Sequence, residues 1–223
     1  MIKFPTKIIE GHLVTDLYGA GVWTIFDTGS PVSFGEIGEF LGYPVLEDGN
    51  GTDIQTLNSL TNFTANALIG MDILSNYNLL FAQNELLLSE NAIDFEGEFS
   101  PIKNFMGIPV MEICVGGQPL SCFVDSGAKI SYISSNLTEG MTSVETRQDY
   151  YPLYGHFETP IFRVDIDING CPLNVAFGNL PKKLEGLLLM LSERNTGILG
   201  SDLFQNFRVY LDFDNMRIGI SKN

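Results

Sequence analysis

Basic side chains are nearly absent from the first half of this 223-residue chain. No Lys or Arg occurs between residues 8 and 102, and residues 1–99 carry 14 acidic side chains against two basic ones. The whole chain has 12 Lys and Arg against 27 Asp and Glu, a formal net charge of −15 at pH 7. Such a charge repels phosphate backbones and attracts cationic groups, which argues against nucleic acid as a partner.

Long apolar runs and cysteine pairs are also lacking. The longest apolar run, Leu187 to Leu191, is far shorter than the roughly 20 residues that a membrane-spanning helix needs. Residues 1–7 show no apolar stretch with a cleavage site, so we expect a cytoplasmic protein without a membrane partner. The three cysteines are an odd number without a Cys-x-x-Cys pair, which argues against a disulfide framework and a zinc site. We therefore expect no metal and no cofactor.

Several catalytic motifs are missing too. The sequence has no Gly-x-Ser-x-Gly elbow, no phosphate-binding Gly-x4-Gly-Lys-[Ser/Thr] loop and no His-Glu-x-x-His pair. The two histidines, His12 and His156, are far apart in the chain and are interpreted as surface or strand residues rather than as bases or metal ligands. No base can be assigned to any of the cysteines as a nucleophile.

What the sequence does contain is typical of a packed, mainly β protein. Apolar residues make up 44% of the chain and charged residues only 17%, which excludes a disordered polar chain. Short runs of Val, Ile, Leu, Phe and Tyr predict strands throughout. Weak helical stretches are predicted at Gly35–Leu41, Met71–Asn76 and Asp202–Asn206.

The sequence also contains an internal repeat. Residues 23–30, Trp-Thr-Ile-Phe-Asp-Thr-Gly-Ser, correspond at an offset of 98 to residues 121–128, Ser-Cys-Phe-Val-Asp-Ser-Gly-Ala. Each copy follows a predicted strand hairpin closed by a glycine turn. Residues 67–77 and 197–207 match at an offset of 130, and each continues into another predicted hairpin. We interpret this pattern as a duplication with lobes at residues 1–97 and 98–223.

The repeated segments place one aspartate in each lobe directly after an apolar strand. A carboxylate buried alone is costly. If a pseudo-twofold arrangement brings the two loops together, Asp27 and Asp125 can share one proton, so that one acts as a base and the other as an acid. The alternative, two unrelated aspartates in turns, would require the repeated architecture to be accidental.

These segments resemble the two catalytic loops of pepsin-like and retropepsin-like aspartic peptidases. Residues 68–70 and 198–200 resemble the paired apolar-apolar-Gly elements of that family, and residues 156–160 are similar to a segment of bacterial retropepsin-like proteins. The resemblance implies a mainly β, two-lobed acid-protease-like fold of duplicated retropepsin-like β-barrel lobes with pseudo-twofold symmetry. It also implies that Asp27 and Asp125 hydrolyse peptide bonds with a water held between them, without a covalent intermediate.

The same resemblance assigns supporting roles to the neighbours of the two aspartates. Hydroxyl groups at the second loop position would brace the loops by hydrogen bonds, and the glycines would allow a close backbone approach. The loop-bracing residues predicted in this way are Thr28, Gly29, Ser30, Ser126, Gly127 and Ala128.

The chain departs from the pepsin pattern in its first half. Only 43 residues separate Asp27 from Gly70, which leaves little room for the tyrosine-bearing flap hairpin that covers the substrate in pepsins. The corresponding interval in the second half is 75 residues long, and its segment 149–156 is rich in aromatic residues with a Gly and a Pro. We expect this segment to be the flap, with Tyr150, Tyr151 and Tyr154 as candidate substrate-binding residues.

The sequence therefore predicts a monomer-competent aspartic endopeptidase whose substrate is an extended peptide or protein segment. Because the first half is acidic, a second negative charge on the pair is disfavoured, and activity is expected mainly below neutral pH. The alternative is a catalytically silent peptide-binding homologue that keeps the fold and both aspartates. The short first half favours that alternative, because it leaves little room for a flap. A fold does not by itself imply an activity.

Overall fold

The structure is a computed structural model that describes residues 1–49, 51–151, 154–191 and 196–222. Strands account for 53% and helices for 12%, so the protein is mainly β as predicted. None of the helices in these four ranges is long and apolar enough to cross a membrane.

The first half is built around a five-stranded sheet in the order β2-β3-β4-β8-β5. Residue Asp27 directly follows β4, which pairs in parallel with β8. The elements of this half are β1 (Ile2–Pro5), β2 (Lys7–Ile9), β3 (His12–Leu17), β4 (Val22–Phe26), β5 (Phe34–Gly35), β6 (Glu39–Phe40), β7 (Tyr43–Pro44), α1 (Ile54–Leu60), β8 (Ala67–Ile69), α2 (Met71–Leu74), β9 (Asn78–Ala82) and β10 (Glu85–Ser89).

The second half repeats this arrangement with longer strands. Asp125 directly follows β13, which pairs in parallel with β18 as β4 does with β8. The elements of this half are β11 (Glu98–Phe105), β12 (Ile108–Val115), β13 (Gln118–Val124), β14 (Ser131–Ile133), a 3-10 helix (Ser135–Leu137), β15 (Glu145–Tyr151), β16 (Gly155–Ile168), β17 (Cys171–Asn179), α3 (Lys182–Leu191), β18 (Thr196–Leu199), α4 (Ser201–Asn206), β19 (Phe207–Asp212) and β20 (Arg217–Lys222).

The apolar-apolar-Gly segments end the parallel strands next to the two aspartate loops. The Asp27 N–H donates to the Ile69 carbonyl, and the Asp125 N–H donates to the Leu199 carbonyl, both at 2.9 Å. A Cβ atom at the following glycine would lie 2.7 Å from a carbonyl oxygen of the aspartate loop in either half. Glycine is therefore required at both positions because the loop backbone passes too close for a side chain. The four hairpins predicted from the sequence are confirmed.

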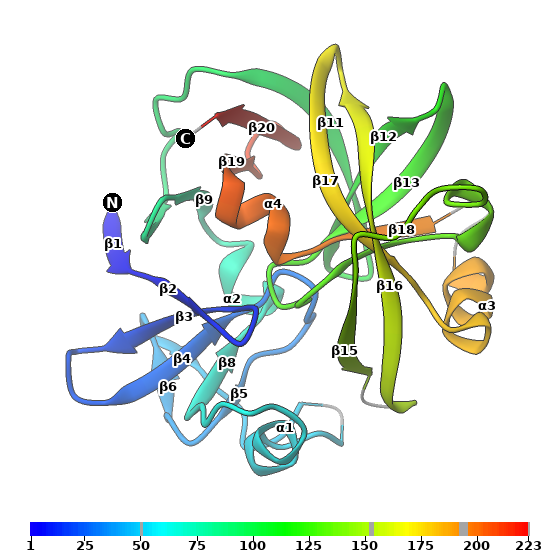
Figure 1. Cartoon of the computed structure of the whole chain (residues 1–223). Coiled ribbons are helices and arrows are strands. Elements are labelled where there is room, and N and C mark those ends of the chain that lie inside the picture. Colours follow the sequence, from blue (N-terminus) through cyan, green and yellow to red (C-terminus); the bar gives the residue numbers. More distant parts are fainter. Residues whose placement is uncertain (50, 152–153, 192–195, 223) are drawn as a thin grey trace.

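A central sheet joins the two halves (Figure 1). Its strands run in the order β1-β10-β9-β19-β20-β11, so strands from the first half lie beside strands from the second. The contact between halves is the antiparallel pairing of β9 with β19, in which Leu80 lies opposite Tyr210. The predicted boundary between residues 97 and 98 falls at the start of β11. Neither half therefore completes this sheet alone.

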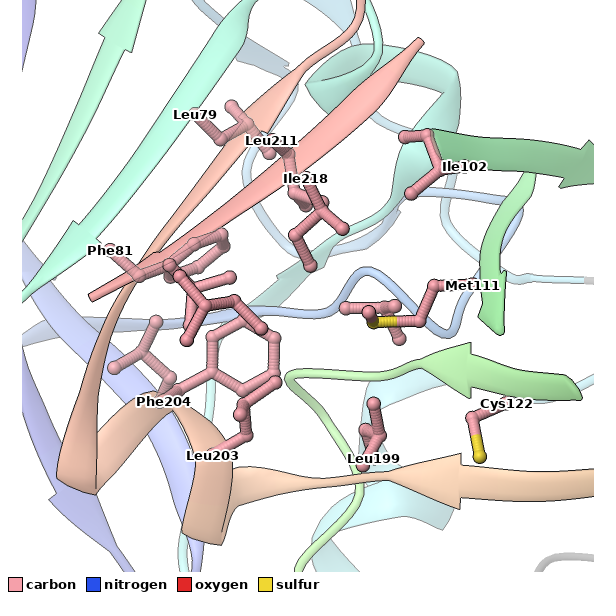
Figure 2. Close-up of a cluster of buried hydrophobic side chains, with 14 of the residues drawn as sticks. Leu79, Phe81, Ile102, Met111, Cys122, Leu199, Leu203, Phe204, Leu211 and Ile218 are labelled. Carbon is pink, nitrogen blue, oxygen red and sulfur yellow. The ribbon is translucent and has the colours of Figure 1, made fainter. Parts of the chain in front are cut away.

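The main hydrophobic core lies beneath the central sheet and draws side chains from both halves (Figure 2). The rings of Phe81 and Phe204 have their centroids 4.7 Å apart in a T-shaped contact. Leu79, Leu211 and Ile218 are fully buried beside them. Since full burial of such a side chain stabilises by about 1.5–3 kcal/mol, this shared core couples the two halves energetically.

The prediction of a helix at Gly35–Leu41 is wrong. This stretch instead contains the end of β5 and the whole of β6. Gly35 adopts a φ of +148°, and a Cβ there would lie 2.4 Å from the Asn66 carbonyl oxygen, because β5 pairs closely with β8. The predicted helices at residues 71–76 and 202–206 correspond to α2 and α4, whereas α1 and α3 were not predicted.

Candidate active site

The two aspartates meet at the floor of a cavity of about 520 Å³ between the two halves. Asp27 and Asp125 both line this cavity, and each is placed there by the buried strand that precedes it. The Gly29 N–H donates to Asp27 Oδ1 at 2.8 Å, and the Gly127 N–H donates to Asp125 Oδ1 at 2.9 Å. Each carboxyl group is thus oriented by the backbone of its own loop.

A reciprocal set of hydrogen bonds clamps the two loops together. The Thr28 hydroxyl donates to the Val124 carbonyl at 2.7 Å, and the Ser126 hydroxyl donates to the Phe26 carbonyl at 2.8 Å. The same hydroxyl oxygens accept from the backbone of the opposite loop, from Ser126 N–H at 2.9 Å and from Thr28 N–H at 3.0 Å. Both side chains are fully buried, and each hydroxyl group donates one hydrogen bond and accepts another within the clamp. Buried polar groups need such partners.

The last residues of the two loops fasten them to the helices that follow the parallel strands. The Ser30 carbonyl accepts from the Met71 N–H, and the Ala128 carbonyl accepts from the Ser201 N–H, both at 2.8 Å. The Ser30 hydroxyl also donates to the Val32 carbonyl at 2.8 Å. The six residues predicted to brace the loops are therefore all in contact with a loop, a strand or a helix start.

The glycines of the loops bring each carboxyl group against the opposite backbone. A Cβ atom at Gly29 would lie 2.1 Å from the Asp125 carboxyl carbon, and one at Gly127 would lie 2.3 Å from that of Asp27. Only glycine leaves room for the facing carboxyl group in each case. The two acids consequently lie side by side rather than merely in the same cavity.

Burial and mutual contact change the ionisation of both aspartates. Burial and the neighbouring negative charge of Asp27 raise the pKa of Asp125 well above its ordinary value. Burial also raises the pKa of Asp27, but hydrogen bonds from Gly29 and Asp125 and the nearby His12 oppose that rise. Because two carboxylates in contact cannot both ionise readily, the pair holds one proton and one negative charge between the two acids.

The walls of the cavity are apolar and come from equivalent positions in the two halves. Leu68 of β8 and Ile198 of β18 both line it, as do Phe34 and Tyr132, which are separated by the same 98-residue offset as the aspartates. Leu57 of α1 adds a further apolar side chain from the first half. Such a cavity suits an extended chain with apolar side chains on either side of the aspartate pair.

The hairpin of β15 and β16 covers the cavity from the second half. Tyr150 and Tyr151 line the cavity together with the aspartates, and Tyr150 also packs against the buried cluster of the first half that contains Ile25 and Phe34. Burial raises the pKa of Tyr150 to about 12, with a smaller contribution from the charges of Asp149 and Asp27. Pro152 and Leu153, at the tip of this predicted flap, lie outside the described residues.

The third tyrosine of the predicted flap lies elsewhere. Tyr154 is 42% exposed, and its ring contacts Phe157 with centroids 5.8 Å apart. It is not among the residues that line the cavity in the described parts of the chain. Tyr150 and Tyr151 are therefore the two hairpin tyrosines that the structure brings to the aspartates.

The hairpin rests on Tyr132, a residue that the sequence analysis did not single out. The Tyr132 hydroxyl donates to Asp149 Oδ2 on β15, and its ring contacts Phe157 on β16 with centroids 6.1 Å apart. Burial raises the pKa of Asp149, while the hydrogen bonds from Tyr132 and from the Tyr150 N–H oppose that rise. Tyr132 thus contacts both strands of the hairpin.

His12 is a strand residue, as the sequence predicts, and it also belongs to the site. It begins β3 and lines the cavity beside the aspartates, with Nδ1 2.9 Å from the Gly127 carbonyl oxygen. Lys129, directly after the second aspartate loop, lines the same cavity. No local pattern marks His12, because its partner lies 115 residues away in the chain.

Comparison with known proteins identifies the fold. No family model matches the sequence, and no curated protein matches it. Among solved structures, the aspartic proteinase from Irpex lacteus is 12% identical, with a TM-score of 0.52 over 100% of this chain and 97% of that one. This chain has the pepsin-like aspartic proteinase fold. A second similar structure, the simian foamy virus (mac) protease, is 17% identical and covers 42% of this chain and 90% of its own, with a TM-score of 0.31.

The two halves of this pepsin-like fold differ in length between the aspartate loop and the parallel strand that ends at the glycine. Among the described residues 34–49 and 51–66, the first half holds the short strands β5 to β7, helix α1 and a tight turn bridged by Asp48 and Asp53, whereas β15 and β16 form a long hairpin in the second half. The described residues contain no group of three or more His, Cys, Asp or Glu side chains that could hold a metal ion.

Proposed function

We propose that this protein is an aspartic endopeptidase in which Asp27 and Asp125 activate a water molecule for the hydrolysis of peptide bonds. The observation that carries the proposal is the mutual packing of each carboxyl group against the glycine of the opposite loop. This contact brings the two carboxyl groups close enough to share one proton, so that the pair can supply the carboxylate and the carboxylic acid that general acid–base catalysis requires.

In this proposal each acid has a different role. Asp27, as the carboxylate, takes a proton from a water held between the two acids, and the resulting hydroxide attacks the carbonyl carbon of the scissile bond. Asp125 donates its proton to the carbonyl oxygen, so a neutral tetrahedral diol forms. When the C–N bond breaks, Asp27 returns its proton to the leaving amine, and Asp125 recovers a proton from the diol. No covalent bond to the protein forms at any step.

The substrate lies extended across the cavity in this proposal. Apolar walls from Phe34, Leu68 and Ile198 accept the side chains that flank the scissile bond. The hairpin bearing Tyr150 and Tyr151 covers the bound segment and reduces the access of bulk water. Since one chain supplies both aspartates, a monomer is sufficient.

The decisive test is cleavage of a diverse peptide mixture by the purified protein between about pH 3 and 7, with products identified by mass spectrometry. Asp27→Asn and Asp125→Asn are each expected to reduce cleavage by at least about 100-fold. Asp94→Asn makes the same substitution at an exposed position outside the cavity and serves as the matched control. Thermal unfolding of all four proteins verifies that they are folded.

Two results would contradict the proposal. The first is cleavage that persists in either active-site variant. The second is a folded wild-type protein that binds a statine-containing peptide in the cavity but cleaves nothing, which would establish the alternative of a silent peptide-binding homologue. That alternative has one structural basis, the short first half, whose described residues line the cavity with a tight turn at Gly49 and Thr52 rather than with a long hairpin.

A further inference from the structure

The His12 imidazole is hydrogen-bonded to Gly127, one of the two loop glycines that each contact both aspartates. Its Nδ1 lies 2.9 Å from the Gly127 carbonyl oxygen. Because a carbonyl oxygen can only accept, Nδ1 must carry the hydrogen and donate it. The N–H of the same Gly127 donates to Asp125, and the Cα of Gly127 faces the Asp27 carboxyl group. A single residue, Gly127, therefore connects His12 to both members of the pair.

The His12 side chain also lines a polar chamber of about 210 Å³ that adjoins the main cavity. The two cavities share four lining residues, His12, Lys129, Asp149 and Tyr150. Since Nδ1 already holds a hydrogen, the second nitrogen, Nε2, is the atom at which the ring gains a positive charge.

Several charged and titratable groups line this chamber together with His12. The β2–β3 turn supplies Glu10, the segment after the second aspartate loop supplies Lys129, β15 supplies Asp149 and Tyr150, and β16 supplies His156. The end of α1 and the residues that follow it, Leu60, Thr61 and Asn62, supply no charged group. Asp27 and Asp125 lie on the side of the main cavity.

We propose that His12 is a positioning residue whose positive charge keeps the aspartate pair singly ionised to a lower pH than the pair would reach alone. This inference rests on the proposed function. In the imidazolium form, the hydrogen bond to the Gly127 carbonyl becomes charge-assisted and holds the second aspartate loop more firmly. The same charge stabilises the carboxylate form of Asp27, the form that takes a proton from water.

The direction in which His12 shifts the pKa values of nearby aspartates agrees with this role. His12 lowers the pKa of Asp27 and also that of Asp149 on the hairpin. When the charge is removed, the Asp27 pKa rises, so the acid limb of the pH profile moves to higher pH. The alkaline limb depends on loss of the proton that the aspartate pair shares.

The test compares the pH dependence of kcat/KM for three variants. His12→Gln keeps an N–H donor but cannot be charged, and we expect its acid limb to move up by about 0.5–1 pH unit, the effect of one charge several ångströms away. His12→Lys keeps a positive charge and should retain the wild-type limb. His156→Gln is the matched control, because His156 faces the same chamber but contacts Tyr150 rather than an aspartate loop.

A second readout does not depend on cleavage. Carbon-13 NMR of labelled aspartate carboxyl groups, assigned with Asp27→Asn, follows the titration of Asp27 directly. We expect its midpoint to rise in His12→Gln and to stay at the wild-type value in His156→Gln and His12→Lys. If wild type cleaves no peptide but these shifts occur, the proposed function fails while the role of His12 stands.

Other outcomes overturn the inference. An unshifted Asp27 midpoint in folded His12→Gln does so whether or not the protein cleaves peptides. A lower kcat/KM at every pH, with both limbs in place, would indicate a purely structural role. An equal shift in His156→Gln would indicate a general effect of charge in the chamber rather than one of His12.

Discussion

Two buried threonines, Thr24 and Thr28, differ in what their hydroxyl groups contact. Both side chains are fully buried, but among the described residues the Thr24 hydroxyl has no hydrogen-bond partner, whereas the Thr28 hydroxyl clamps the second aspartate loop. Valine has the same shape as threonine without the polar atom. The two positions therefore separate the effect of the clamp from the effect of removing any buried hydroxyl.

Thr28→Val is expected to lower the free energy of unfolding by about 1–3 kcal/mol, because it leaves the Ser126 N–H and the Val124 carbonyl without partners. Thr24→Val is expected to leave stability unchanged or raise it, because it removes an unpaired polar atom. Urea denaturation of both variants measures the difference. Equal losses at the two positions would show that the clamp adds nothing to stability.

At the scale of single residues, the sequence predicted those residues of the candidate site that recur in both copies of the internal repeat. Asp27 and Asp125 were found because their neighbours recur at an offset of 98. The same offset relates Tyr132 to Phe34, so Tyr132 could have been found, but an aromatic residue after a loop is equally typical of a core. His12 could not be found, since its significance depends on a carbonyl group of the other half.

At the scale of elements, the β15–β16 hairpin depends on Tyr132 for its position over the cavity. Tyr132→Phe keeps the ring contact with Phe157 but removes the hydroxyl that donates to Asp149 Oδ2, while the Tyr150 N–H still donates to Oδ1. A half-buried carboxylate that has lost one of its hydrogen bonds is more stable nearer to water, so the hairpin is expected to open more often. The predicted result is faster hydrogen exchange of residues 145–151 and a loss of about threefold to tenfold in kcat/KM.

Tyr154→Phe is the control for this prediction. Its ring also contacts Phe157, but it is exposed and lies away from the cavity. The variant should leave both exchange and kinetics at wild-type values. Unchanged exchange of the hairpin in Tyr132→Phe would show that the ring contacts alone hold it.

Element prediction succeeded where local pattern and tertiary pairing agree. The hairpins around residues 13–26 and 110–124 have alternating or continuous apolar strands and glycine turns, and the structure confirms them. Residues 35–41 have no such signal, and the pairing of β5 with β8 overrides their weak helical tendency. Helix α1 was missed because its residues are mostly weak helix formers, although Asp53 caps its first turn by accepting from the Thr56 N–H.

At the scale of the whole molecule, the aspartate pair lowers stability as the pH rises. The ordinary pKa of an aspartate is 3.8, and that of folded Asp125 is well above it. Between these two values the folded state holds a proton that the unfolded state has lost, so the free energy of unfolding falls with increasing pH. Below the ordinary value both states are protonated, and the penalty vanishes.

Asp125→Asn is therefore expected to melt at a higher temperature than wild type near neutral pH, with the gain shrinking toward about pH 3, where both states are protonated. Each kcal/mol corresponds to about 2–4 °C for a domain of this size. Calorimetry at several pH values measures the difference, with Asp94→Asn as the control for loss of one charge. Parallel curves for wild type and Asp125→Asn would contradict the raised pKa.

The pairing of β9 with β19 also sets an order of events during synthesis. β9 is complete once residue 82 has left the ribosome, whereas β19 begins at residue 207 and its partner β20 at residue 217. Until those residues emerge, β9 keeps a free edge and the shared core lacks Leu211 and Ile218. A nascent chain thus exposes both aspartates to the cell well before it can complete the sheet that unites their two halves.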